Sequence, residues 1–160
     1  MALRNIRIND DPILRKRSRE VENFDERLFI LLDDMKDTLY KAEGCGLAAV
    51  QVGVLKRVVI IDVGDGLMEL INPEIVYTSG EQYEYEGCLS IPGKSAITKR
   101  PMTVKVKAQD RNGKWCLYTG SGLKARAFCH ELDHLDGHLY TERLAPAEVV
   151  KKIEEELGVE

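Results

Sequence analysis

Hydrophobic residues recur at helical spacing between Asp25 and Gly44, in the segment DERLFILLDDMKDTLYKAEG. The apolar positions lie three or four residues apart and therefore share one face of a helix: Leu28, Leu31, Leu32, Met35 and Leu39. Gly44 has the character of a helix stop. The pattern predicts an amphipathic helix whose apolar face packs on a sheet.

The next segments carry the patterns of β-strands. The run RVVIIDV (57–63) predicts a short buried strand, and LMELINP (67–73) predicts a second strand that ends at Pro73. Residues 74–87 predict a hairpin that turns at Ser79 and Gly80. In 103–119, apolar and polar residues alternate on either side of Asn112-Gly113, which predicts a further hairpin. Its inward positions are Val104, Val106 and Ala108, and its outward positions are Lys105, Lys107 and Gln109.

The pattern becomes helical again after Gly120. Ser121 suits the N-cap, and Gly137 suits the position just past the helix end. The expected core contacts of this helix are Leu123, Ala127, Phe128 and Leu135. A last, short helix is expected from about Ala147 to Leu157, with Val149, Val150, Ile153 and Leu157 on one side. The order of elements predicts an α+β fold, with antiparallel strands packed around the central helix that follows Gly120.

Composition and charge place the chain among soluble globular proteins. Its 160 residues are 44% hydrophobic and 31% charged, which suits one domain spanning residues 1–160. A net charge of −4 offers no basic surface for nucleic acid or anionic membranes. The longest apolar runs, LFILL and VVII, are too short to cross a bilayer, and MALRNIRINDDP lacks the apolar stretch of a signal peptide. We therefore expect a cytoplasmic protein that binds neither nucleic acid nor membranes.

Four cysteines could ligate a metal or simply pack: Cys45, Cys88, Cys116 and Cys129. Without export signals, free thiols or metal ligation are expected rather than disulfides. Cys116 lies within an alternating strand, and Cys129 would point about 100° away from His130 on a helix. Neither of these two is expected to be a ligand.

All three histidines lie in the stretch HELDHLDGH, from His130 to His138. His130 and His134 fall one helical turn apart, with Cβ atoms about 5–6 Å apart, so both can bind one divalent ion. Glu131 flanks the same face and can reach a water on that ion. The H-E-x-x-H pattern indicates a metal-dependent hydrolase, although so short a pattern also arises by chance on helix surfaces.

The third ligand decides the class of hydrolase. A metzincin protease requires a histidine three residues after the glycine, where this chain has Tyr140. His138, directly after Gly137, is therefore expected to be a surface residue. A gluzincin-type protease takes a downstream glutamate, and Glu142 and Glu148 remain open on this ground.

Cys88 is the better candidate for the third ligand. In EGCLSIP it follows Gly87 at the end of a predicted strand, where a side chain can point into a cleft. A thiolate and two imidazoles leave a fourth position open, as in catalytic metal sites. The segment GCGLAAVQ (44–51) adds glycines that allow close backbone approach and the amide of Gln51, although a helix-to-strand turn explains it equally well.

These three stretches together resemble peptide deformylase, the hydrolase that removes the formyl group from the N-terminal methionine of nascent bacterial and organellar proteins. The family motifs GΦGLAAxQ, EGCLS and HExDHLxG are similar to GCGLAAVQ, EGCLS and HELDHLDG, in the same order. The segments INP, KRP and ARAFCHELDH extend the similarity over about residues 4–144. Val50, Cys45 and Cys129 depart from residues common in the family without touching the metal or the base.

The resemblance implies the residues that perform the chemistry. The metal ligands would be Cys88, His130 and His134, and Glu131 would be the general acid/base. Gln51 and the backbone N–H of Leu89 would hold the carbonyl oxygen. Metal-bound hydroxide would attack the formyl carbon, because a metal lowers the pKa of bound water toward about 7.

Surrounding residues receive supporting roles from the same resemblance. Gly46 and Leu47 would line the cleft, and Gly44 with Cys45 would border the methionine pocket. Glu86 would pair with Arg100 and brace the cysteine loop. Asp133, three residues after His130, would orient a ligand histidine or remain a solvated helix charge.

The resemblance also implies the cofactor and partners. One divalent ion per chain is expected, ferrous iron in cells, with zinc, nickel or cobalt able to occupy the site in purified protein. The substrates would be N-formyl-methionyl nascent peptides, and the protein is expected to be a monomer. Some deformylases dock on the ribosome through a longer basic C-terminal helix. From Pro146 onward this chain has five Glu against two Lys, so at most a transient ribosome contact is expected.

Two alternatives carry different functions. A different metallo-amidase on the same scaffold would choose other substrates through the pocket around Cys45. A non-catalytic, zinc-stabilised binding domain would need neither Glu131 nor Gln51, and the presence of both residues argues against it.

Overall fold

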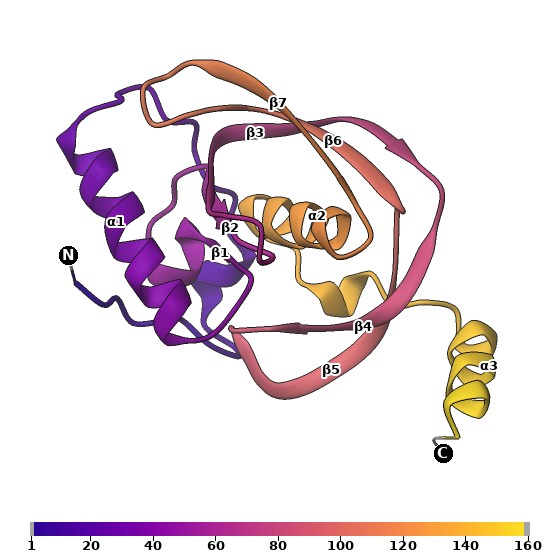
Figure 1. Cartoon of the computed structure of the whole chain (residues 1–160). Coiled ribbons are helices and arrows are strands. Elements are labelled where there is room, and N and C mark those ends of the chain that lie inside the picture. The colour runs from indigo at the N-terminus through magenta and orange to yellow at the C-terminus, as the bar shows by residue number, and fades with distance from the viewer. Residues whose placement is uncertain (1, 159–160) are drawn as a thin grey trace.

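A computed structural model describes residues 2–158 of the chain. Its elements follow the predicted α+β order (Figure 1). The helices are α1 (Glu26–Lys41), α2 (Leu123–Leu135) and α3 (Ala147–Leu157), with short 3-10 turns at Pro12–Arg15, Ala49–Val52 and Tyr140–Glu142. The strands are β1 (Gly46–Ala48), β2 (Val58–Ile61), β3 (Met68–Ser79), β4 (Gln82–Cys88), β5 (Ile91–Arg100), β6 (Thr103–Gln109) and β7 (Trp115–Ser121).

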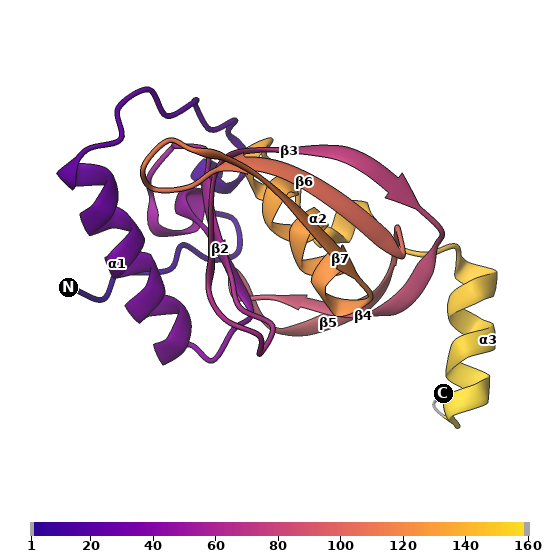
Figure 2. The ribbon, with the colours of Figure 1, turned by 45° about the horizontal axis from the view of Figure 1, so that its top comes forward.

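The strands form two antiparallel sheets that enclose α2. The larger sheet has the order β1-β2-β3-β6-β7, and β4 pairs only with β5. Figure 2 shows α2 between the strands β3, β6 and β7 on one side and the β4-β5 pair on the other. One apolar core lies between α2 and the larger sheet, and a second lies between α1 and the segment from β1 to β2. The helix with the histidines therefore lies in the interior of the fold.

Helix α1 has the predicted apolar face, but it ends earlier than predicted. The side chain of Asp25 caps the helix by accepting from the Leu28 N–H at 3.2 Å, and every predicted apolar position is buried. The helix ends at Lys41, and Glu43 with φ of 57° takes the left-handed position expected of Gly44. Gly44 lies against the side chains of Leu39 and Leu89 instead, where a Cβ would not fit without movement.

The strand that was expected to end at Pro73 continues to Ser79 as β3. Proline cannot donate a ladder hydrogen bond, and the register of β3 against β6 shifts between Ile71 and Glu74, where Pro73 lies. Asn72, with φ of 51°, compensates through its amide, which accepts from the Val21 N–H and donates to the Val21 carbonyl. The bulge therefore lets the strand pass a residue that normally ends one.

The hairpin predicted for 74–87 is wrong. Strand β3 pairs with β2 and β6, whereas β4 leaves this sheet after Gly80 and pairs with β5 on the other side of α2 (Figure 1). The hairpin predicted for 103–119 is confirmed as β6 and β7, with Val104, Val106 and Ala108 buried. A local pattern identifies strands, but it does not say which strand becomes the partner.

The ends of the last two helices also differ in part from expectation. Ser121 belongs to β7, and Gly122, with φ of 62°, is the N-cap of α2 without a side-chain hydrogen bond. Helix α3 has the predicted bounds, but none of its described residues is buried, and Leu157 is 61% exposed. Within residues 2–158, no helix combines the length and apolar character needed to cross a lipid bilayer.

Replacing Gly137 with alanine is expected to destabilise the fold. Gly137 follows α2 at φ of 79°, and a Cβ there would collide with the backbone carbonyl of Arg15. The backbone conformation alone costs an alanine about 1–2 kcal/mol, and the collision adds to this cost. Urea unfolding would measure the loss. Gly113→Ala is the matched control, because Gly113 has φ of 84° but only ordinary contacts with Phe24; an equal loss in both variants would contradict the role of the Arg15 contact.

Candidate metal and catalytic site

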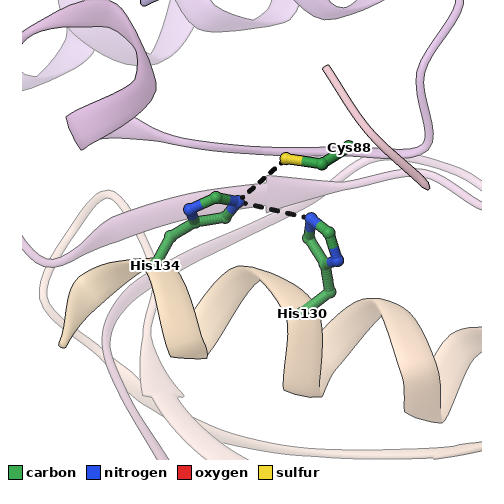
Figure 3. A group of neighbouring side chains, drawn as sticks. All are labelled: Cys88, His130 and His134. Carbon is green, nitrogen blue, oxygen red and sulfur yellow. Dashed lines mark hydrogen bonds between the residues drawn. The ribbon is translucent and has the colours of Figure 1, made fainter. Parts of the chain in front are cut away.

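Three potential ligand atoms converge beside α2 (Figure 3). The Sγ of Cys88, at the end of β4, lies 3.4 Å from the Nε2 of His134, and that Nε2 lies 3.3 Å from the Nε2 of His130. The ligand atoms of the three residues all lie within 4.8 Å of one another. Helical spacing brings the two imidazoles together, and the strand end delivers the thiol from the opposite sheet.

The chemistry of these three atoms fits a divalent metal ion. His130 Nδ1 lies 2.6 Å from Glu86 Oε2, so Nδ1 carries the donated hydrogen and the Nε2 lone pair points toward His134. Burial lowers the pKa of His134 well below its usual value, which keeps that imidazole neutral. The lone pairs of the two imidazole nitrogens and of the sulfur face one point and repel one another. A single shared proton could form a hydrogen bond between only two of these three atoms. A cation bound by all three removes the repulsion.

A buried ion-pair network fixes the orientation of His130. Glu86 accepts from His130, from Thr98 at 2.9 Å and from Arg100 at 2.6 and 3.1 Å. Burial alone would raise the pKa of Glu86, but the hydrogen bonds from His130 and Arg100 outweigh it and lower the pKa to about 2. The ion pair of Glu86 with Arg100 implied by the resemblance is therefore present.

Asp133 contacts Arg100 rather than a histidine. Arg100 Nη1 donates to Asp133 Oδ2 at 2.8 Å, and Arg143 donates to the same carboxylate at 3.2 and 3.3 Å. Asp133 is thus neither a direct partner of His130 nor a solvated charge. It holds the arginine that holds Glu86, the residue that contacts His130.

Glu131 is a buried carboxylate without a protein partner on one oxygen. Its residue is 3% exposed, and Oε1 makes no hydrogen bond within the described chain. Oε2 lies 4.0 Å from His130 Nε2. Burial raises the pKa of Glu131 to about 7, which suits a group that takes up and releases a proton near neutral pH.

Gly46 makes room for this carboxylate. A Cβ on Gly46 would lie 2.5 Å from Glu131 Oε2 and 2.8 Å from Cδ. Leu47, in contrast, does not line the cleft: its side chain is fully buried in the core against α1. Successive side chains of a strand point to opposite faces, so the residue after Gly46 faces away from Glu131.

Gln51 lies beside the cysteine with its amide held in one orientation. Its Oε1 accepts from the Ala48 N–H at 2.9 Å, so Nε2 faces Ser90 Oγ at 3.0 Å and Cys88 Sγ at 3.7 Å. Leu89 lies in the turn between β4 and β5. The contact of Gln51 with Ser90 was missed at the sequence level, although Ser90 closes the EGCLS motif.

A cleft of about 640 Å³ opens at the site. Its walls include Gly44, Cys45 and Gly46 on one side and Gly87, Cys88 and Leu89 on the other. Leu123, Arg126 and Ala127 of α2 border it, with His130 and Glu131 at its base. The two glycine-rich segments and one helix face therefore form a single cleft.

The remaining candidate residues lie outside the group formed by Cys88, His130 and His134. His138 is half-buried and its Nδ1 lies 3.2 Å from Glu142 Oε1, so neither joins the three ligand atoms. Glu148 is exposed on α3. All four cysteines are free, and Cys129 packs in the core, as expected. Sequence patterns missed Tyr140, whose ring stacks on His130 with centroids 6.2 Å apart.

Comparisons with known proteins show which family the chain belongs to. A sequence model of the polypeptide deformylase family matches residues 3–150. The peptide deformylase of Alkaliphilus metalliredigens is 55% identical over 144 residues, which cover 90% of this chain and 98% of the relative. That of Acetivibrio thermocellus is 60% identical over 144 residues, with coverages of 90% and 85%.

Solved structures show the same fold. The crystal structure of peptide deformylase from Thermotoga maritima has a TM-score of 0.89 and 40% identity, covering 91% of this chain and 100% of that one. The enzyme from Legionella pneumophila has a TM-score of 0.87 and 41% identity, covering 98% and 96%. Since the family match spans nearly the whole fold, the chain belongs to the polypeptide deformylase family, hydrolases that remove the formyl group from nascent peptides.

Proposed function

We propose that Cys88, His130 and His134 hold the metal ion of this deformylase and that Glu131 is its general acid/base. The convergence of three ligand atoms beside a buried, unpartnered carboxylate supports this assignment. Ferrous iron is the ion in cells, and zinc, nickel or cobalt replaces it in purified protein. When bound, such an ion supplies positive charge that lowers the pKa of water and polarises the formyl carbonyl.

The chain's own residues handle the proton and the oxyanion. Glu131 takes a proton from the attacking water and returns it to the amine nitrogen as the C–N bond breaks, leaving formate and a free N-terminus. Gln51 Nε2 and the backbone N–H of Leu89 donate hydrogen bonds to the oxygen that gains charge at the formyl carbon. The Ala48–Gln51 hydrogen bond supports this role, because it orients the amide donor in advance. Losing one such donor typically reduces the rate about 10²–10³-fold.

The substrate lies in the cleft with its formyl group at the base. Gly44, Cys45 and Gly46 border the methionyl residue, and their small side chains let a peptide backbone approach closely. We extend the proposal to a monomer that acts in the cytoplasm and makes at most transient contact with the ribosome. The acidic residues of α3 support the last point, since ribosomal RNA is an anion.

A deformylation assay on anaerobically purified protein, combined with metal analysis, tests the function. Release of formate from a formyl-methionyl tripeptide, with about one divalent ion per chain, is expected. No formate with iron, zinc, nickel or cobalt would rule out the proposed function. Turnover of other formylated or acylated amides, but not of formyl-methionine, would identify a different metallo-amidase.

Cys88→Ser is expected to weaken metal binding strongly. The Cys88 sulfur converges with both imidazoles, and a serine hydroxyl in its place is a much poorer ligand for such an ion. Because even outer partners of metal ligands change affinity about 10–100-fold, we expect a loss of at least about 100-fold. Competition with a chelator would measure it. Cys116→Ser on β7 is the control and should keep full affinity; unchanged affinity in Cys88→Ser would exclude Cys88 as a ligand.

A further inference from the structure

Arg126 lies on the same face of α2 as the two histidines. It precedes His130 by four residues, as His130 precedes His134, so the three side chains form one row along the helix. Arg126 lines the same cleft as the ligand residues Cys88 and His130. With Leu123 it also lines a second groove, which includes Glu81, Glu84 and Ile153 of α3. It therefore lies where the cleft opens toward the rest of the molecular surface.

Within residues 2–158, the guanidinium of Arg126 forms no ion pair with a carboxylate. Nη1 donates to the Tyr85 carbonyl at 2.9 Å, which anchors the side chain to β4. Its Nε–H is buried without an acceptor in the described part of the chain. Other arginines near the site are paired: Arg100 binds Glu86 and Asp133, and Arg143 binds Asp133. A half-buried guanidinium that has a free donor and no anion beside it can form a further, charge-assisted hydrogen bond with a ligand.

The other charges of the cleft do not compensate this cation. Glu86 is neutralised by Arg100 and by its bond to His130. Glu131 lies five residues further along α2, beside His130, and Glu43 lies on the segment before β1. Two more carboxylates line the groove beside Leu123: Glu81 lies 3.4 Å from Lys99, and Glu84 forms no ion pair with Arg126 within residues 2–158. The guanidinium of Arg126 therefore keeps hydrogen-bond donors available to a ligand.

The helix geometry gives the distance between Arg126 and the proposed metal ligands. One helical turn separates Arg126 from His130, a rise of about 5.4–6 Å, and an extended peptide advances about 3.3 Å per residue. With the formyl group at the metal cluster, the side chains of the second and third residues come within reach of Arg126. A guanidinium recognises a carboxylate through a planar pair of hydrogen bonds.

We propose that Arg126 determines substrate specificity by binding an acidic side chain at the second or third position of the formyl-methionyl peptide. Nascent chains with Asp or Glu there are deformylated faster than chains with neutral or basic residues. This inference rests on the proposed function, because it places the formyl group at the Cys88–His130–His134 cluster. Arg126 touches the substrate outside the reacting atoms, so its effect appears mainly in KM.

The experiment compares matched peptides with the metal-loaded enzyme. The peptides are formyl-Met-Glu-Ser, formyl-Met-Gln-Ser and formyl-Met-Lys-Ser, and the same series with the variable residue third. A partly exposed ion pair predicts a kcat/KM about 3- to 5-fold higher for Glu than for Gln at low salt. This ratio should fall toward one in 1 M KCl, where the Debye length is about 3 Å.

Three variants test whether Arg126 causes the preference. Arg126→Gln should abolish the Glu-over-Gln preference while still processing the Gln peptide, and Arg126→Lys should keep part of it. Lys124→Gln is the matched control, because Lys124 lies on the same helix but pairs with Asp65 at 2.9 Å. Equal rates for Glu and Gln peptides at both positions would overturn the inference, as would a preference that survives in Arg126→Gln or disappears in Lys124→Gln.

A binding measurement separates this inference from the proposed function. Calorimetric dissociation constants of the unformylated products Met-Glu-Ser and Met-Gln-Ser do not require turnover. A tighter Glu product that loses its advantage in Arg126→Gln would support the role of Arg126 even if no formate were released. Turnover of the Gln peptide without any Glu preference, in rate or in binding, would leave the proposed function intact and contradict the role of Arg126.

Discussion

Replacing Glu131 with glutamine is expected to reduce the rate of deformylation about 10²–10⁴-fold, the usual contribution of a positioned general acid/base. Glutamine has nearly the same shape, so it fits the buried space beside Gly46 that a larger group could not share. It can neither take up nor release the proton that a carboxylate with a pKa of about 7 transfers. The loss should appear in kcat, measured as formate release at saturating substrate.

The metal content separates this loss from damage to the site. Cys88, His130 and His134 remain, so the Glu131→Gln variant should bind one ion as the parent does. Glu131→Ala should behave in the same way. Glu131→Asp keeps the carboxylate but draws it back from the cluster, and an intermediate rate is expected. Near-normal turnover by the glutamine variant would show that another group transfers the proton.

Replacing Glu86 with glutamine is expected to destabilise the fold by about 3–5 kcal/mol, the cost of removing one partner from a buried ion pair. The side chains of Glu86 and Arg100 are 6% and 4% exposed, so water cannot replace the lost charge. Asp133 alone would then balance Arg100, and His130 would lose the acceptor of its Nδ1–H. Urea unfolding of the metal-loaded protein measures the effect.

An exposed ion pair beside the same two strands is the control. Glu81 of the β3–β4 turn lies 3.4 Å from Lys99, with side chains 57% and 48% exposed. Exposed pairs contribute about 0–1 kcal/mol, so Glu81→Gln should change the unfolding free energy by no more than that. Equal effects of the two substitutions would mean that burial does not strengthen the role of Glu86.

Local patterns predicted much of the site. The pairing of His130 with His134 follows from helical spacing alone, and the H-E-x-x-H order put Glu131 beside them. The strand end at Cys88 was recognisable from its neighbours, and the three-atom cluster contains the predicted ligands. Such predictions succeed because one helical turn or one strand end determines the relevant geometry.

The predictions that failed depended on contacts between segments far apart in the chain. The segment before Cys88 was assigned to a hairpin with residues 74–79, whereas β4 pairs with β5 across α2. Leu47 was expected in the cleft because it belongs to the same motif as Gly46, yet it points into the core. Asp133 was expected to contact a histidine and contacts Arg100. Each difference concerns which surface a side chain meets, and sequence spacing does not determine this.

By itself, the sequence determined the amphipathic helices, the β6-β7 hairpin, the three motifs and the residues that can bind a metal ion. These features depend on periodicity within one element, where neighbouring residues fix the geometry. Only the tertiary structure decided that β4 pairs with β5, that Gly46 makes room for Glu131, and that Arg126 lines the cleft with its Nε–H unpaired in the described part of the chain. These contacts join segments far apart in the chain, and their geometry exists only after both sheets have packed around the helix.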